Sequence, residues 1–198
     1  MAFQFMPGAT AIGLTHQDGI VLAAEKRISY GNFVVNKNTK KIFSITDQVA
    51  SACAGMVADM QVLTRQVGAL AKIRKLETRR YTTTNSVAKL MSVILFERRY
   101  FPLLTQVIVG GVHDVPEIYT LDPLGSLLPD NYAAVGTGAE LALGLIDSEY
   151  KKNMSEDASK KLAIKAIKSS IQRDSASGDG IDILTITKKG IAEESVSL

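Results

Sequence analysis

The chain has 198 residues, 46% of them hydrophobic, and a formal net charge of only +3, with basic and acidic residues interspersed. This balance argues against a nucleic-acid-binding protein, which would cluster Lys and Arg on one face, and no apolar run approaches the ~18 residues of a membrane-spanning helix. The single Cys53 excludes an internal disulfide and suits a reducing compartment. We therefore expect a soluble, cytoplasmic chain that forms one domain.

The first quarter of the chain predicts short strands separated by turns. His16 sits in a turn with Asp18-Gly19, which lies between two apolar runs and is a strong hairpin signal. Gly31-Asn32 has the composition of a second turn. Strands are expected at residues 10–15, 20–24, 33–35, 41–44 and 48–54.

Two amphipathic helices are expected next. Apolar residues recur at helical spacing from Met56 to Leu70 and again from Val87 to Leu95. Either Thr84 or Asn85 is a plausible cap of the second helix, because such side chains accept a hydrogen bond from the first helical turn.

The second half of the chain repeats the pattern of strands followed by two helices. Because strands come in runs and do not alternate singly with helices, a doubly wound parallel sheet is disfavoured. We predict an α+β fold, a four-layer αββα sandwich of two antiparallel sheets with a helical layer on each outer face. The elements are expected at residues 105–111, 117–121 and 132–135 (strands), 139–150 and 155–173 (helices), and 182–187 and after Lys189-Gly190 (strands).

Two features of the first quarter could carry chemistry, and each also has a structural explanation. The short leader of residues 1–7 ends at Gly8 and could simply be a disordered start. Lys41 could be a solvated surface group, or it could be a buried ammonium that lowers the pKa of a neighbouring nucleophile.

Two further features are open to the same choice. Residues 172–180 could be a helix end with turn residues, or a loop that presents Asp174 and Ser177 to a site. Ala54-Gly55 could be a helix boundary, or it could offer a free N–H to an oxyanion. His16 and His113 have no partners at ligand spacing, so we expect no metal site.

Taken together, these stretches resemble the β-type subunits of the 20S proteasome, particularly archaeal ones. The segments that carry the resemblance are collinear and span nearly the whole chain, and the last of them is the most specific. They are Ala9-Thr10-Ala11-Ile12-Gly13-Leu14, Asp18-Gly19-Ile20-Val21-Leu22-Ala23, Glu25-Lys26-Arg27, Lys40-Lys41-Ile42-Phe43, Ala54-Gly55, Val109-Gly110-Gly111, Gly136-Thr137-Gly138 and Arg173-Asp174-Ser175-Ala176-Ser177-Gly178.

The resemblance implies the N-terminal-nucleophile hydrolase fold, with a leader of residues 1–8 and a single domain of residues 9–198. In that family a propeptide is removed autocatalytically after a glycine, which here is Gly8. The new N-terminal threonine then supplies the nucleophilic hydroxyl. Its α-amine, with a reference pKa near ~8, accepts the proton.

The same resemblance implies roles for further residues. Glu25 would pair with Lys41, which activates the threonine, and Thr137 would lie near the α-amine. Asp174 and Ser177 would hold the N-terminus and Lys41 in place.

On the substrate side, the resemblance implies that the N–H of Gly55 forms the oxyanion hole. Ser29 and Gly55 would hydrogen-bond the substrate backbone as an added strand. An apolar specificity pocket, which favours cleavage after hydrophobic residues, would be shaped by Ile28, Cys53 and Val57.

The chain departs from the family at residue 9, where the nucleophilic threonine belongs and the sequence has Ala9. A methyl group can neither attack a carbonyl nor release the leader. Either Ala9 replaces the threonine of a proteolytic subunit, or the chain is a naturally inactive subunit beside an active paralogue. Thr10 is a weaker candidate nucleophile, because a one-residue shift turns the side chain to the other face of the strand.

The partners implied by the resemblance are other β-subunits in a seven-membered ring, α-subunit rings, a regulatory ATPase that acts through the α ring, and unfolded polypeptide substrates. No cofactor is implied. A non-proteolytic amide hydrolase on the same fold is disfavoured, because residues 173–178 resemble proteasome subunits specifically.

Overall fold

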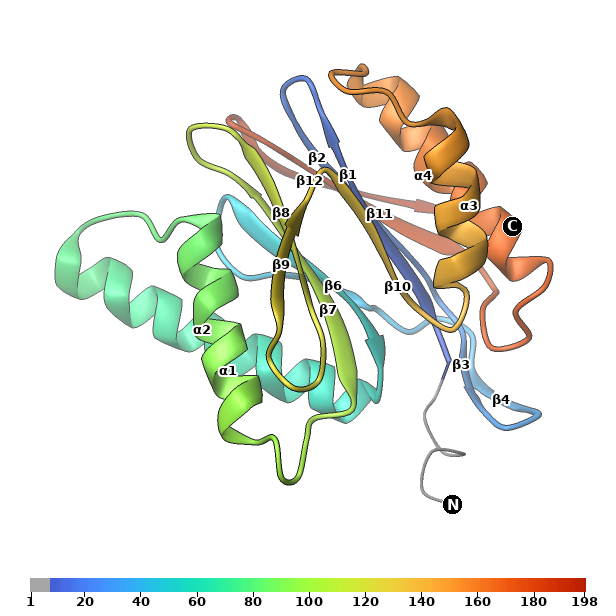
Figure 1. Cartoon of the computed structure of the whole chain (residues 1–198), viewed down its shortest axis with the longest axis horizontal. Coiled ribbons are helices and arrows are strands. Elements are labelled where there is room, and N and C mark those ends of the chain that lie inside the picture. The colour runs from blue at the N-terminus through green and yellow to red at the C-terminus, as the bar shows by residue number, and fades with distance from the viewer. Residues whose placement is uncertain (1–7) are drawn as a thin grey trace.

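Two antiparallel five-stranded sheets lie face to face in the computed structural model, which describes residues 8–198, and a pair of helices covers the outer face of each sheet (Figure 1). This is the predicted four-layer αββα sandwich. Of the expected leader, Gly8 is within the described range and residues 1–7 lie outside it.

The sheet that contains the first strand, here called sheet I, has the strand order β10-β1-β2-β11-β12. β1 and β2 form the hairpin expected around Asp18-Gly19, and β1 pairs on its other side with β10 from the second half of the chain. The strands are β1 (Thr10–His16), β2 (Gly19–Glu25), β10 (Tyr132–Gly136), β11 (Ile181–Thr187) and β12 (Gly190–Val196).

The other sheet, sheet II, has the order β5-β6-β7-β8-β9, and a separate hairpin, β3-β4, projects at the end of the molecule where β1 begins (Figure 1). The sequence pattern missed the short strands β3 and β9, which lack a clear alternation of buried and exposed residues. The bounds are β3 (Ile28–Tyr30), β4 (Phe33–Asn36), β5 (Ile42–Ser44), β6 (Val49–Gly55), β7 (Thr105–Val112), β8 (Pro116–Leu121) and β9 (Leu127–Asp130).

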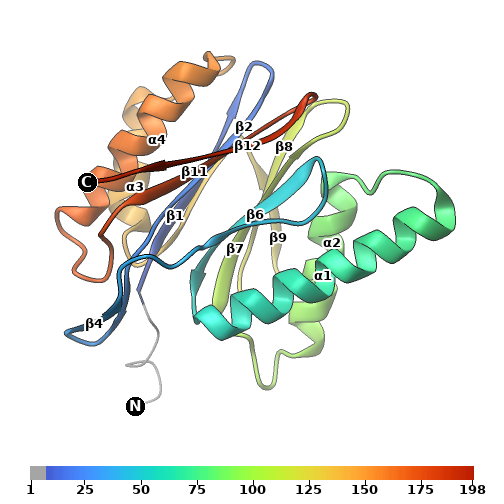
Figure 2. The same cartoon turned by 180° about the vertical axis from the view of Figure 1, so that it is seen from behind.

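The helices follow the expected order, with two corrections. α1 extends beyond the predicted apolar repeat, and Leu70, which that repeat included, is 39% exposed. The N-cap of α2 is Thr83, which accepts the N–H of Ser86 at 3.2 Å, so the prediction of Thr84 or Asn85 was wrong; Thr84 is fully buried. α1 (Val57–Thr78) and α2 (Thr84–Glu97) cover sheet II, as Figure 2 shows from behind, and α3 (Ala139–Glu149) and α4 (Glu156–Ile171) cover sheet I.

Side chains at the start of the described chain point alternately into two different apolar layers. Ala9 and Ala11 belong to the core between the two sheets, whereas Ile12 and Leu14 belong to the core between sheet I and helices α3 and α4. Because successive side chains of a strand point to opposite faces, Thr10 shares the helix-facing side with Ile12. Residues 9 and 10 therefore belong to different layers. A third core fills the space between sheet II and helices α1 and α2.

His16 ends β1 and is buried, whereas the sequence suggested a turn position. Its Nδ1 accepts the N–H of Asp18 at 3.3 Å, and its buried Nε2 has no hydrogen-bond partner among the described residues. Burial lowers the pKa of His16; the Glu156 and Asp18 carboxylates oppose this effect, and the Lys160 ammonium adds to it.

Candidate active site

The backbone of residue 9 is held by the segment that follows β10. The N–H of Ala9 donates to Thr137 Oγ1 at 3.2 Å, and the N–H of Gly138 donates to the Ala9 carbonyl at 3.4 Å. Ala9 is only 1% exposed. Residue 9 is thus fixed at both its amide and its carbonyl, at the end of sheet I where β1 begins and β10 ends.

A chain of hydroxyl groups connects this segment to the loop after α4. Asp174 Oδ2 accepts the hydroxyl hydrogens of Thr137 at 2.6 Å and of Ser177 at 2.7 Å. Since Ser177 donates to the carboxylate, its oxygen accepts the hydrogen of Thr10 Oγ1, 2.8 Å away. The loop is fixed internally, because the N–H of Ala176 donates to Asp174 Oδ1 at 3.1 Å.

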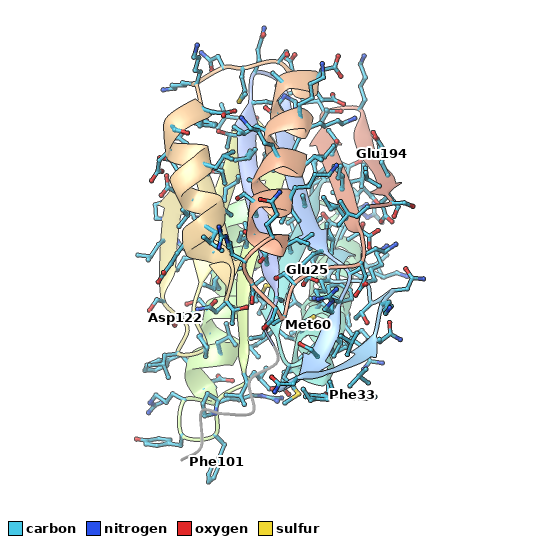
Figure 3. All side chains as sticks on the ribbon, turned by 90° about the vertical axis from the view of Figure 1, so that its right-hand side faces the viewer. Glu25, Phe33, Met60, Phe101, Asp122 and Glu194 are labelled. Carbon is cyan, nitrogen blue, oxygen red and sulfur yellow. The ribbon has the colours of Figure 1, made fainter. Side chains whose placement is uncertain are left out.

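A buried ion pair lies beside the peptide that joins residues 9 and 10. Lys41, immediately before β5, donates to Glu25 Oε1, and the two side chains are 2% and 0% exposed. The same oxygen accepts the N–H of Thr10 at 3.3 Å, so the ammonium lies next to that peptide. Figure 3 labels Glu25 near the middle of the molecule in that view.

The Glu25 carboxylate is further satisfied by the backbone. Its Oε2 accepts the N–H of Arg27 at 2.7 Å and that of Gly178 at 3.0 Å, and Lys41 donates to the Arg27 carbonyl at 2.5 Å. Burial lowers the pKa of Lys41, an effect that the Glu25 carboxylate opposes. The activation of a hydroxyl at residue 9 by Lys41 stays a prediction.

Two glycines let the segments of the site approach each other closely. A side chain at Gly8 would overlap the side chains of Ala176 and Thr137. A side chain at Gly136 (φ +98°) would overlap the Ala9 carbonyl and crowd Ala54. Gly136 therefore lies between residue 9, which immediately precedes β1 of sheet I, and the Ala54-Gly55 segment of sheet II. The segment predicted to supply an oxyanion N–H is close to residue 9.

The side chains expected to bind substrate are more dispersed. Ser29 is buried on β3, and Ile28 beside it is partly exposed. Cys53 is buried on the outer face of β6, in the same apolar cluster as Val57, and burial raises the pKa of its thiol to about 12. Cys53 and Val57 therefore belong to the layer under α1, whereas Gly55, at φ +128°, ends β6 beside it. Their roles in substrate binding stay predictions.

Two residues without a predicted role also belong to the candidate active site. Arg27 donates from Nε to Asp179 at 2.7 Å, and its guanidinium lies so close to Gly178 that a Cβ there would overlap it. Gln106 of β7 accepts the N–H of Gly136 at 2.8 Å. Arg27 was visible in the motif at residues 25–27, and Gln106 was visible as a polar residue in an apolar strand.

Within residues 8–198, no group of three or more His, Cys, Asp or Glu side chains is arranged to hold a metal ion. Across the same described range, no helix is long and apolar enough to cross a membrane.

An αββα sandwich with a buried lysine–carboxylate pair and a set of hydroxyl groups around the start of its first strand defines the class of N-terminal-nucleophile hydrolases. Comparisons with known proteins narrow this class. A family model described as "Proteasome subunit" matches residues 6–186.

Two relatives specify the type of subunit. Proteasome subunit beta 1 of Nitrosopumilus maritimus is 61% identical over 189 residues, which cover 96% of this chain and 96% of that protein. Proteasome subunit beta 2 of Pyrobaculum calidifontis is 48% identical over 192 residues, which cover 96% of this chain and 95% of that protein. The chain belongs to the proteasome subunit family, as an archaeal-type β-subunit within a group of threonine endopeptidases.

Proposed function

We propose that this chain is a β-subunit of the 20S proteasome core particle that is catalytically inactive, and keeps its leader, because residue 9 is Ala. One observation carries the proposal: the backbone of Ala9 is held by Thr137 and Gly138, next to a buried Lys41 whose partner is Glu25. The site is built around a residue whose methyl group cannot act as a nucleophile.

The missing hydroxyl is sufficient to abolish proteolysis. Removing the nucleophile from a cooperative hydrolase site lowers kcat by about 10⁶-fold in the best-studied case. The same loss prevents self-cleavage between Gly8 and Ala9. Thr10 is a poor substitute, because it is fully buried on the opposite face of the strand and its hydroxyl is engaged by Ser177.

Two histories are compatible with an alanine at this position. In one, Ala9 replaces the threonine of a proteolytic subunit and traps the unprocessed form. In the other, the chain is a structural ring member that assembles beside an active β-subunit. The native codon for residue 9 distinguishes the two.

The assembly that we propose is that of the family. β-subunits form seven-membered rings, stacked in pairs between α-subunit rings, and a regulatory ATPase delivers unfolded polypeptides through the α ring to the cytoplasmic core particle. Glu25, Lys41, Thr137, Asp174 and Ser177 would serve residue 9, and Gly55 would supply the oxyanion N–H.

On the substrate side of the proposed site, Ser29 and Gly55 would bind the substrate backbone. The apolar specificity pocket would be shaped by Ile28, Cys53 and Val57.

The test is Ala9→Thr, co-assembled with its α-subunits and no other β-subunit. We expect loss of residues 1–8 by intact mass and hydrolysis of a fluorogenic peptide with a hydrophobic cleavage residue. Ala9→Val is the matched control, because valine has the shape of threonine without the hydroxyl. Assembly of Ala9→Thr without hydrolysis would mean that the site is defective beyond residue 9. Loss of residues 1–9 from the unaltered chain would instead revive Thr10 as the nucleophile.

A further inference from the structure

Gln106 is a half-buried polar residue in the otherwise apolar strand β7. Its carboxamide oxygen accepts the N–H of Gly136 at 2.8 Å. β7 lies in sheet II and Gly136 ends β10 in sheet I, so this hydrogen bond crosses from one sheet to the other. The donor is a backbone N–H, which requires an oxygen as its acceptor and so fixes the orientation of the carboxamide.

Gly136 is in direct contact with the backbone of residue 9. Its φ of +98° is a conformation that L side chains rarely adopt, and a Cβ at this position would overlap the Ala9 carbonyl. It also ends an edge strand, so its outer side has no neighbouring strand in sheet I. The next two residues, Thr137 and Gly138, make the hydrogen bonds to Ala9.

The same side chain lies beside the other half of the site. Gln106 is directly opposite Ala54 in the β6–β7 pairing, and Thr105 is opposite Gly55. Ala54 is also the residue that a Cβ on Gly136 would crowd. Gln106 therefore touches sheet I at the segment that holds residue 9, and sits in sheet II next to the segment proposed to bind the oxyanion.

We propose that Gln106 is a positioning residue that aligns residue 9 with the Ala54-Gly55 segment across the sandwich. It acts through the Gly136 N–H and has no contact with reacting atoms. This inference rests on the proposed function of residue 9 as the position of the nucleophile. A nucleophile carried by one sheet and an oxyanion donor carried by the other must keep a fixed separation, because displacements near 1 Å can lower rates about 100-fold.

The kinetic test uses Ala9→Thr as the parent, assembled with its α-subunits. In Gln106→Met the new side chain has a length similar to that of glutamine but no oxygen acceptor, whereas in Gln106→Glu an oxygen acceptor is kept. The control Gln48→Met makes the same change at another half-buried glutamine, near the opposite end of β6. We expect Gln106→Met to lower kcat about tenfold or more, with KM nearly unchanged and slower loss of the leader. Gln106→Glu should recover part of that loss, and Gln48→Met should match the parent.

The inference is overturned if Gln106→Met keeps the parent kcat, or if Gln106→Glu loses as much activity as Gln106→Met. A packing role would lower the melting temperature and not kcat per assembled ring. The melting temperature of each variant is therefore measured alongside its activity.

A second readout separates this inference from the proposed function. In the unaltered Ala9 chain, Gln106→Met should speed amide hydrogen exchange at least tenfold in the peptides that contain residues 9–10 and 136–138, while other peptides of sheets I and II keep their rates. If Ala9→Thr proves inactive, the proposed function fails but this measurement still tests Gln106. Unchanged exchange in both peptides would refute the positioning role.

Discussion

The Lys41–Glu25 pair is expected to stabilise the fold independently of any catalysis. Lys41→Met leaves the Glu25 carboxylate buried without its cation, and Glu25→Gln leaves the Lys41 ammonium buried without its anion. Removing one partner of a buried pair typically costs about 3–5 kcal/mol, because an uncompensated charge remains. For a domain whose total free energy of unfolding is about 5–15 kcal/mol, this is a large fraction.

The contacts of the pair determine which single change is worse. After Lys41→Met, the carboxylate of Glu25 still accepts three backbone N–H groups, from Thr10, Arg27 and Gly178, so the cost should lie near ~3 kcal/mol. After Glu25→Gln, the carboxamide oxygen and the Arg27 carbonyl can still accept from the ammonium, but no anion compensates its charge. The carboxamide NH2 would also face the N–H groups of Arg27 and Gly178 that Glu25 Oε2 accepts, so the cost should lie nearer ~5 kcal/mol. The double variant removes both charges and should cost less than the sum of the two singles by at least ~2 kcal/mol.

Urea unfolding of the isolated subunit, followed by circular dichroism, measures these differences as shifts of the midpoint at constant slope. Lys75→Met is the control, because it breaks a solvent-exposed pair with Asp47 and should barely move the midpoint. The reasoning is refuted if either single change costs less than ~1 kcal/mol, or if the two costs simply add.

Three further predictions concern the cap, the glycine and the histidine. Thr83→Ala should lower the free energy of unfolding by about 1 kcal/mol through loss of the α2 cap, measurable in urea, with Thr83→Ser restoring it. Gly136→Ala should destabilise the fold by at least ~1 kcal/mol and speed hydrogen exchange at residues 9–10, because its Cβ meets the Ala9 carbonyl at a positive φ; unchanged exchange would contradict this. Because burial lowers the pKa of His16, the unfolded state binds the proton first, so stability should fall as the pH drops below about 6.5, by up to ~1.4 kcal/mol per pH unit. Urea unfolding between pH 7 and pH 5 should show that the free energy of unfolding falls less steeply with decreasing pH in His16→Gln than in the unaltered chain. Equal slopes in the two proteins would contradict this role of His16.

The layer architecture could be predicted because each layer has a local signature: buried strands such as 20–24, and helical repeats such as Val87 to Leu95. The cap of α2 was misplaced because Thr83 and Thr84 are adjacent and chemically equivalent, and only tertiary packing buries the second. The Gln106 contact joins residues 30 apart in different sheets, and a contact of that kind leaves no periodic trace in the sequence.

The structural role of the polar residues bears on how an inactive subunit would evolve. Lys41 and Glu25 fill a space with almost no access to water, so losing either one alone should destabilise the fold whether or not residue 9 is a nucleophile. Thr137 likewise accepts the N–H of Ala9, and Asp174 in turn accepts the Thr137 hydroxyl. We therefore expect these side chains to persist in a natural structural subunit.

The side chain at residue 9 is the exception within this set. The methyl group of Ala9 packs in the apolar core between the sheets, and the hydrogen bonds that fix the residue use its backbone. Exchange of a threonine for alanine here would remove the nucleophile and leave those backbone contacts in place. If residue 9 is the position of the nucleophile, as proposed, this exchange would abolish catalysis at little cost to the fold, and we expect it as an early step from protease to structural subunit.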